Sequence, residues 1–135
     1  MSATESVALS HFELIGGQAA VDRLVEAFYR RMDTLPAAAA IRALHPPDLS
    51  GTKAVLKKYF AEWLGGPSLY SQERGHPRLR MRHLPFSIGA PERDAWMLCM
   101  RGAIEEVVGS EPLRESLLEK MFKTADWMRN RGNAQ

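Results

Sequence analysis

The sequence contains 135 residues, 45% of them hydrophobic and 25% charged, which suits one globular domain and excludes fibrous, disordered and membrane-spanning classes. The formal net charge of +2 is too small to demand a nucleic-acid partner. The single cysteine, Cys99, forms neither an internal disulfide nor a multi-thiolate metal site, and its place in an apolar helical stripe predicts a buried, inert thiol.

The first segment with helical periodicity follows Gly16-Gly17 and ends before Pro36. Its apolar stripe consists of Val21, Leu24, Val25, Phe28 and Met32. Tyr29 lies on the flank of that stripe. A short helix is expected from Ala37 to Leu44, because the two prolines at 46 and 47 stop it.

Three further segments have the same periodicity. The second begins near Ser50 or Thr52, either a suitable N-cap, and ends at Gly65-Gly66-Pro67. Its apolar positions are Val55, Leu56, Tyr59, Phe60, Trp63 and Leu64. The third begins at Pro91, and its stripe is Trp96, Cys99, Met100, Ala103, Ile104 and Val107. The fourth follows Ser110, with inward positions at Leu113, Leu117, Leu118, Met121, Phe122, Ala125 and Met128.

No segment alternates with a period of two over the length of a strand, so we predict an all-α fold in one domain, residues 1–135. Residues 1–11 are expected to form a flexible or pre-helical N-terminus, and residues 129–135 a frayed C-terminus. The N-terminal sequence lacks the basic segment and apolar run of a signal peptide, so we expect a cytoplasmic protein without a membrane span. The stretch from Gly65 to Ala90 is irregular and long for a compact domain, which indicates a function.

The four histidines limit the metal chemistry that the chain can support. His11, His45, His76 and His83 have neither the spacing of a zinc site nor the Glu-x-x-His pattern of a di-iron bundle. No serine stands in a nucleophile elbow, although a triad assembled in space stays open. Haem iron needs only one protein ligand, because the porphyrin supplies four nitrogens.

The segment around His83 offers what a haem requires. Arginines at 78, 80 and 82 precede it as partners for propionates, and Leu84, Pro85 and Phe86 follow as apolar contacts. The long helices add side chains with flat aromatic rings, those of Tyr59, Phe60, Trp63 and Trp96. Plainer interpretations stay open: His83 as an ordinary loop histidine, the arginines as a solvated or anion-binding patch, and the aromatic residues as core.

The segment from Gly65 to Met100 resembles the signature region of group II truncated haemoglobins. The resemblance depends on the run "GHPRLRMRH", the proline-phenylalanine pair after it, and "ERDAW". It extends more weakly from about Phe12 to Met128. The resemblance implies a shortened globin: a two-over-two sandwich of helices around haem b, with the proximal helix reduced mostly to a loop.

The resemblance also implies roles for single residues. His83 matches the proximal iron ligand, and Arg82 matches the basic residue near a propionate. Residues expected to contact the haem are His83, Arg82, Leu56, Tyr59, Phe60, Tyr70, Phe86 and Trp96. Residues expected to stabilise the ligand by donating hydrogen bonds are Tyr29, Trp96 and His45. Relatives commonly carry Phe or Tyr at the position of His45, and Thr52 matches the place where larger globins have a distal histidine.

These assignments imply a haem protein that binds O2 and other small diatomic or anionic ligands at a five-coordinate iron. A neutral His83 would coordinate through one ring nitrogen and donate from the other, for example to the carbonyl of Leu79. The partners expected are small haem ligands and an electron-donating reductase, but no nucleic acid and no membrane, and the chain is expected as a monomer or weak homodimer. Two alternatives are an enzyme that converts nitric oxide or peroxide, and a non-haem helical module that binds anions or nucleic acid through the arginines.

Overall fold

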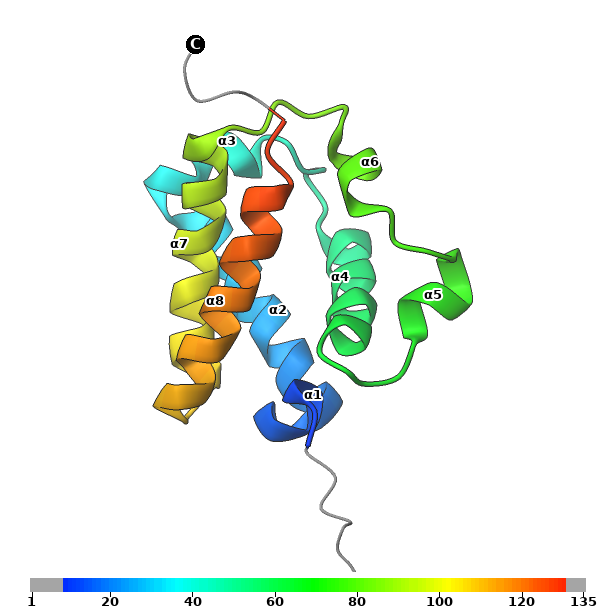
Figure 1. Cartoon of the computed structure of the whole chain (residues 1–135). Helices are drawn as coiled ribbons and strands as arrows, with labels where there is room; N and C mark the ends of the chain where they lie inside the picture. Colours follow the sequence, from blue (N-terminus) through cyan, green and yellow to red (C-terminus); the bar gives the residue numbers. More distant parts are fainter. Residues whose placement is uncertain (1–8, 131–135) are drawn as a thin grey trace, which may run out of the picture.

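Two pairs of long helices form the frame of the molecule. In the computed structural model, which describes residues 9–130, helices α2 (Gly17–Thr34) and α4 (Ser50–Trp63) form one pair. Helices α7 (Ala90–Val107) and α8 (Glu111–Trp127) form the other, and α2 packs against both α4 and α7 (Figure 1). No strand occurs in the described part of the chain. The predicted all-α, two-over-two arrangement is therefore confirmed.

Helix α2 supplies the centre of the core. Its predicted stripe, from Val21 to Met32, is 0–1% exposed, and each such side chain contributes about 1.5–3 kcal/mol when it leaves water. The stripe faces α7 and α4, so one helix joins the two layers. Helix α2 ends two residues before Pro36, where the amide of Leu35 still donates to the carbonyl of Arg31 (2.8 Å).

A short helix that the periodicity did not predict, α1 (His11–Ile15), precedes α2. Ser10 and Glu13 form a reciprocal capping box, with both bonds at 3.1 Å. Gly16 then takes a φ of +117°, which lets the chain turn sharply into α2. The expected pre-helical segment 1–11 thus overlaps α1 at its end, and residues 1–8 lie outside the described part.

The connection between α2 and α4 is held in place by one arginine. It contains a 3-10 turn, Pro36–Ala38, and helix α3 (Ala39–Arg42), which lie where a short helix was predicted. Arg42 pairs with Asp33 (2.5 Å) and donates to the carbonyls of both prolines at 46 and 47 (2.9 Å each). The loop that carries His45 is therefore fixed against the end of α2.

Helix α4 begins near Ser50, as predicted, but its capping residue differs from the prediction. The structure begins α4 at Ser50, but the side chain that receives its amide is that of Asp48, at 3.0 Å. Neither Ser50 nor Thr52 acts as the predicted N-cap. Asp48 precedes the helix in an Asx-type turn. The prediction considered only hydroxyl side chains directly before the apolar stripe and therefore missed Asp48.

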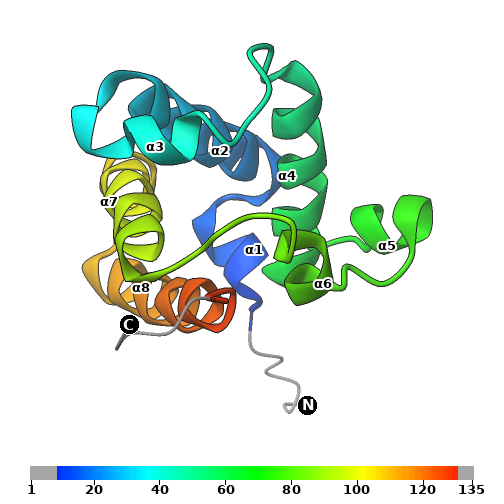
Figure 2. The same ribbon diagram turned by 90° about the horizontal axis from the view of Figure 1, so that it is seen from above.

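The expected irregular stretch between Gly65 and Ala90 contains two short helices, α5 (Leu69–Arg74) and α6 (Leu79–His83). Arg78, in the left-handed region with φ of +49°, directs the chain into α6. Figure 2 shows α6 at one end of α4, α5 further out, and a long connection running from α6 to α7. None of the described helices is long and apolar enough to cross a membrane.

The predicted starts of the last two long helices are confirmed. Glu92 accepts from the amide of Gly89 at 2.7 Å, and Ser110 accepts from the amide of Leu113 at 3.4 Å. Cys99 is fully buried, and burial raises the pKa of its thiol, as expected for an inert side chain. Phe122 is a correction: predicted to face inward, it is 41% exposed, and the guanidinium of Arg93 stacks on its ring at 5.0 Å.

Candidate haem pocket

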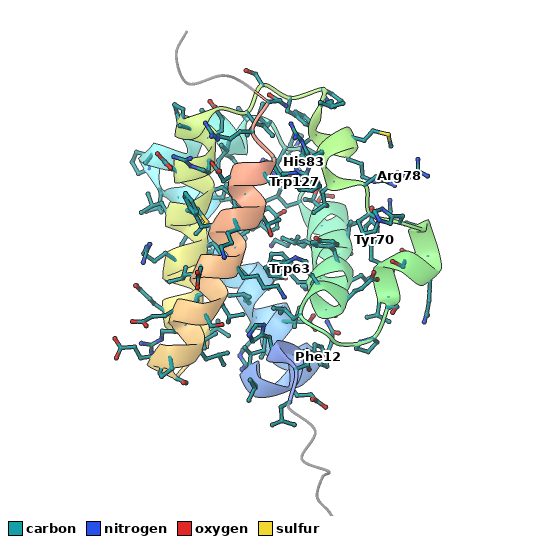
Figure 3. All side chains as sticks on the ribbon, in the orientation of Figure 1. Phe12, Trp63, Tyr70, Arg78, His83 and Trp127 are labelled. Atoms are coloured by element: carbon teal, nitrogen blue, oxygen red, sulfur yellow. The ribbon has the colours of Figure 1, made fainter. Side chains whose placement is uncertain are left out.

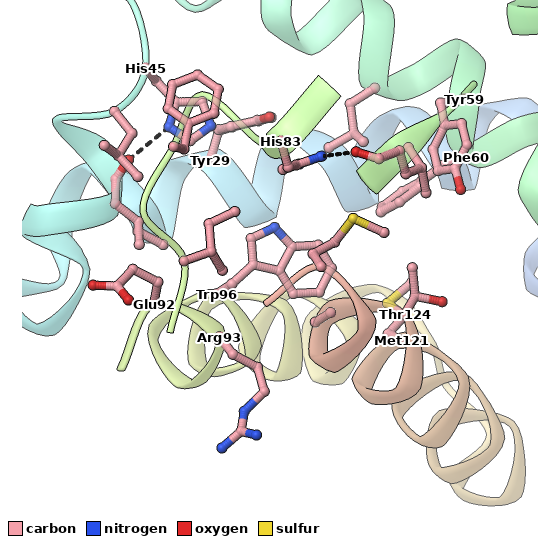
Figure 4. A pocket seen from close by; sticks show the side chains of 18 of the residues that line it. Tyr29, His45, Tyr59, Phe60, His83, Glu92, Arg93, Trp96, Met121 and Thr124 are labelled. Carbon is pink, nitrogen blue, oxygen red and sulfur yellow. Dashed lines mark hydrogen bonds between the residues drawn. The ribbon is translucent and has the colours of Figure 1, made fainter. Parts of the chain in front are cut away.

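A cavity of about 370 Å³ lies between the two helix pairs, within the usual size range of ligand pockets. Its walls come from all four long helices, from α6, which carries His83, and from the loop that carries His45 (Figure 4). The lining residues are Tyr29, Ile41, Leu44, His45, Pro46, Leu56, Tyr59, Phe60, Trp63, Leu79, His83, Phe86, Ile88, Glu92, Arg93, Trp96, Met121, Thr124, Ala125 and Met128. Most of these side chains are apolar, so the cavity suits a flat hydrophobic group.

His83 is the last residue of α6, and its ring enters the cavity between α4 and α8 (Figure 3). Its Nδ1 lies 2.6 Å from the carbonyl oxygen of Leu79, one turn earlier. A carbonyl only accepts, so Nδ1 carries the hydrogen and Nε2 of the neutral ring keeps a lone pair. The predicted bond to Leu79 is confirmed, and it leaves Nε2 free for a metal.

The loop after His83 is held by Asn130. The side-chain amide of Asn130 donates to the carbonyls of His83 (3.3 Å) and Phe86 (2.8 Å). Its oxygen accepts from the amide of Ile88 (2.9 Å), and its own backbone amide donates to the Ile88 carbonyl (2.8 Å). Asn130 thus lies in the segment expected to be frayed but is firmly bonded, while residues 131–135 lie outside the described part.

Tyr29 and Trp96 present hydrogen-bond donors to the cavity. Tyr29 is 4% exposed, and Phe28 packs between it and Trp96, with ring centroids 4.9 and 5.2 Å away. Neither the Tyr29 hydroxyl nor the Trp96 indole N–H bonds to any described residue, and the indole nitrogen points into the cavity (Figure 4). Burial raises the pKa of Tyr29 well above its usual value, so its hydroxyl keeps its proton.

His45 lies beside Tyr29, with ring centroids 5.8 Å apart and the planes nearly perpendicular. Its Nδ1 is 2.8 Å from the carbonyl oxygen of Ile41, so in the neutral ring that nitrogen carries the hydrogen. The sequence-based expectation that His45 offers its N–H to a ligand therefore does not hold for the neutral ring. Its position in the cavity wall agrees with the expectation.

Helix α4 forms an aromatic wall. Leu56, Tyr59 and Phe60 line the cavity, as does Trp63 one turn further on. Burial, assisted by the negative charge of Glu62, raises the pKa of Tyr59 to about 12, so this phenol also stays neutral.

Two of the expected haem contacts lie away from the cavity wall. Tyr70 is 5% exposed and packs edge-on behind Tyr59, 5.7 Å between ring centroids. Arg82 is exposed, and its Nε donates to the carbonyl of Pro77 at 2.8 Å. Arg80 likewise donates to the Arg129 carbonyl (3.2 Å). The roles of Arg82 and Tyr70 toward a haem remain predictions.

Helix α8 and the start of α7 contribute lining residues that sequence reasoning did not assign to the site. They are Met121, Thr124 and Ala125 of α8, and Met128 directly after it. Inward spacing was the only signal for Met121, Ala125 and Met128, and Thr124 had none. Glu92 and Arg93 also reach the cavity wall, but Glu92 caps α7 and Arg93 is held by Asp94 (2.9 Å) and Asp126 (2.7 Å). The charge of Arg93 is thus already paired, and the Glu92 carboxylate is bonded to a backbone amide.

The residues present fit a haem. The described residues contain no group of three or more His, Cys, Asp or Glu that could hold a bare metal ion, so an iron here would depend on a porphyrin. Nε2 of His83 would bind the iron, the walls are mostly apolar, and two unbonded donors, Tyr29 and Trp96, lie across the cavity.

Comparison with known proteins agrees with this site. The model of the bacterial-like globin family matches residues 10–130. Group 2 truncated hemoglobin YjbI of Bacillus subtilis is 38% identical over 119 residues, 88% of each chain. The group II 2-on-2 hemoglobin of Agrobacterium tumefaciens is 44% identical and superimposes with a TM-score of 0.90, covering 94% of this chain and 98% of that one. A cold-adapted truncated hemoglobin of Pseudoalteromonas haloplanktis also gives 0.90, at 35% identity, covering 92% of this chain and 100% of that one.

The family model covers most of the chain, and these relatives align over nearly their whole length. A mostly apolar cavity lies between the helix pairs, and His83 in its wall is oriented by the carbonyl of Leu79. The chain therefore belongs to the bacterial-like globins, and within them to the group II truncated, two-on-two haemoglobins.

Proposed function

We propose that the protein binds haem b through His83 and takes up O2 reversibly. The observation that carries the proposal is the pairing of a histidine whose N–H is already bonded to Leu79 with two unbonded donors across the cavity, Tyr29 and Trp96. When bound, haem supplies an iron with one open position for a small ligand. Haem b is the form expected because the chain has one cysteine, fully buried, and no thioether attachment motif.

The protein's own residues divide the work. His83, oriented by the carbonyl of Leu79, would hold the haem iron, while the aromatic side chains of α4 and the inward residues of α8 would exclude water. Tyr29 and Trp96 donate to a ligand that carries partial negative charge. A bond to a charged acceptor contributes about 1.5–3 kcal/mol, so these donors favour retention of the ligand.

The test is reconstitution of the purified chain with hemin, followed by dithionite reduction and exposure to O2. We expect a Soret band, a spectrum that changes reversibly with O2, and loss of both in His83→Ala. A colourless wild-type protein under these conditions would contradict the proposal. Retention of the full spectrum in His83→Ala would show that another residue holds the group.

The same pocket would serve an enzyme that converts nitric oxide or peroxide with electrons from a separate reductase. The observation that favours this second function is the cluster of three polar side chains, Tyr29, His45 and Trp96, on one side of the cavity. Steady turnover with an electron donor would support this second function. Reversible binding of O2 without turnover would support only the first proposal. A cytoplasmic location and a monomeric or weakly dimeric state are part of the proposal.

A further inference from the structure

We propose that His45 accepts a hydrogen bond, and then a proton, from ligands that enter the pocket in protonated form, such as hydrogen cyanide, hydrogen sulfide and hydrogen peroxide. This inference rests on the proposed haem function and names a ligand class for the same site. It assigns to His45 the opposite role to the donors Tyr29 and Trp96. The pocket would then distinguish ligands that carry a proton from those that do not.

The tautomer of His45 carries the argument. The Ile41 carbonyl already accepts from the amide of Leu44 (3.1 Å), and Nδ1 of His45 fills its second acceptor position (2.8 Å). A carbonyl has no hydrogen to give, so the neutral ring has its N–H on Nδ1. Nε2 is then a basic lone pair, on the part of the ring that faces the cavity and Tyr29 (Figure 4).

The loop geometry keeps this tautomer in place. The backbone amide of His45 donates to the Arg42 carbonyl (3.0 Å), and the Arg42 side chain bonds to the two prolines that follow. To turn its N–H into the cavity, the ring of His45 would have to move away from the Ile41 carbonyl. Such a turn would leave the Ile41 carbonyl without its second hydrogen bond.

The other titratable groups in the cavity wall do not replace His45 as a proton acceptor. Described residues of this kind are Tyr29, Tyr59, Glu92, Arg93 and His83. The two tyrosines keep their protons because burial raises the pKa of each, and Arg93 is a cation paired with two aspartates. Glu92 is bonded to the Gly89 amide, and His83 lies across the cavity from His45.

The proposed step balances without a further reactant. Hydrogen cyanide gives its proton to Nε2 of His45, the bond from carbon to hydrogen breaks, and its electron pair stays on cyanide. His45 becomes an imidazolium whose new N–H then donates back to the anion. CO and O2 bring no proton, so the step does not arise for them.

The kinetic test compares wild type with His45→Phe and His45→Gln in the haem-loaded protein. At neutral pH cyanide is present mainly as hydrogen cyanide, and its association with the ferric protein is measured beside CO association with the ferrous protein. A positioned base typically contributes 10²–10⁴-fold, so we expect the ratio of the two rate constants to fall about 100-fold in His45→Phe. Gln accepts a hydrogen bond but takes no proton, so its ratio should fall less.

CO serves as the control for pocket size, because it probes the same space without a proton. A ratio of cyanide to CO association rates that is unchanged in both variants would overturn the inference. If CO still binds in that case, the proposed haem function is unaffected. A protein that fails to bind haem or CO would instead overturn the proposed function, and with it this step.

A second measurement reads the tautomer directly. In the ferrous carbonmonoxy protein, the ring ¹⁵N shifts of His45 should show a protonated Nδ1 and an unprotonated Nε2 at neutral pH. A hydrogen on Nε2, in the other tautomer or in an imidazolium, would overturn the inference. His45→Gln lacks the imidazole ring, so the two signals that disappear in this variant are those of His45.

Discussion

Nδ1 of His83 donates to the carbonyl of Leu79 over 2.6 Å, and both residues belong to the five-residue helix α6. The bond fixes the ring and raises the basicity of the nitrogen that faces the cavity. Removal of the side chain while the pocket is kept tests this relationship. We expect His83→Gly, loaded with haem in the presence of free imidazole, to regain a Soret band but to show a lower iron–imidazole stretching frequency than wild type. An equal frequency would mean that the Leu79 bond has no electronic effect.

The donors Tyr29 and Trp96 should slow the release of O2. Tyr29→Phe removes the hydroxyl donor and Trp96→Phe the indole N–H donor, and both keep an aromatic ring in the cavity wall. At about 1.5–3 kcal/mol per bond to a charged acceptor, we expect each to speed dissociation about ten- to hundredfold. Stopped-flow displacement of O2 measures the rate. CO dissociation should change far less, and a double variant with an unchanged O2 off-rate would contradict the donor role.

Asn130→Ala should loosen the segment that follows His83. The variant leaves the Ile88 amide and the Phe86 carbonyl without their side-chain partners. A lost bond of this kind costs about 1–3 kcal/mol when the remaining group is kept from water. Urea unfolding measures the free energy, and transfer to a haem-scavenging protein measures haem loss, which should become faster. Asn130→Asp keeps the oxygen that accepts from Ile88 but not the donor, so it should lie between wild type and Asn130→Ala.

The ion pair between Arg93 and Asp126 predicts a specific pH dependence. The hydrogen bond from Arg93 lowers the pKa of the Asp126 carboxyl below its ordinary 3.8. A lowered pKa means that the contribution is present above the unfolded value and is lost as the pH falls through the folded one. Asp126→Asn should therefore be less stable than wild type at pH 7, and the difference should shrink as the pH falls below the ordinary pKa of Asp126 and vanish only below its lowered pKa in the folded protein. A difference that persists in strong acid, measured by urea unfolding across pH, would exclude this cause.

The long helices were predictable because each buries a stripe with a period of 3.6 residues over many turns. Phe28 and Met32 in α2, and Met100 and Ile104 in α7, are fully or almost fully buried, as that period requires. Phe122 breaks the rule because the flank of such a stripe lies at the edge of the core, where Arg93 covers it.

The short elements were not predictable in the same way. Helices α1, α5 and α6 have five or six residues, less than two turns. A helix this short does not repeat the apolar spacing often enough for the pattern to be recognised. Their signals are local, such as the capping pair Ser10 and Glu13 before α1. The bond from His83 to Leu79 was predictable because it needs only one turn of helix.

The site was predictable where the type of a single residue determines its chemistry. It was less predictable where the role of a residue depends on which groups the fold brings next to it. His83, Tyr29 and Trp96 were identified and line the cavity, whereas Met128 showed only an inward position that equally fits plain core. The tautomer of His45 depends on a single carbonyl, that of Ile41, lying in reach of one ring nitrogen. No pattern of residue types encodes that distance.

Asn130 closes the proximal loop from a position 47 residues after His83. During synthesis on the ribosome, His83 therefore emerges well before the residue that secures its surroundings. The cavity that we propose for haem is complete only after α8 has been made and has docked, and a nascent chain that stops short of α8 would leave this apolar cavity open to water and chaperones.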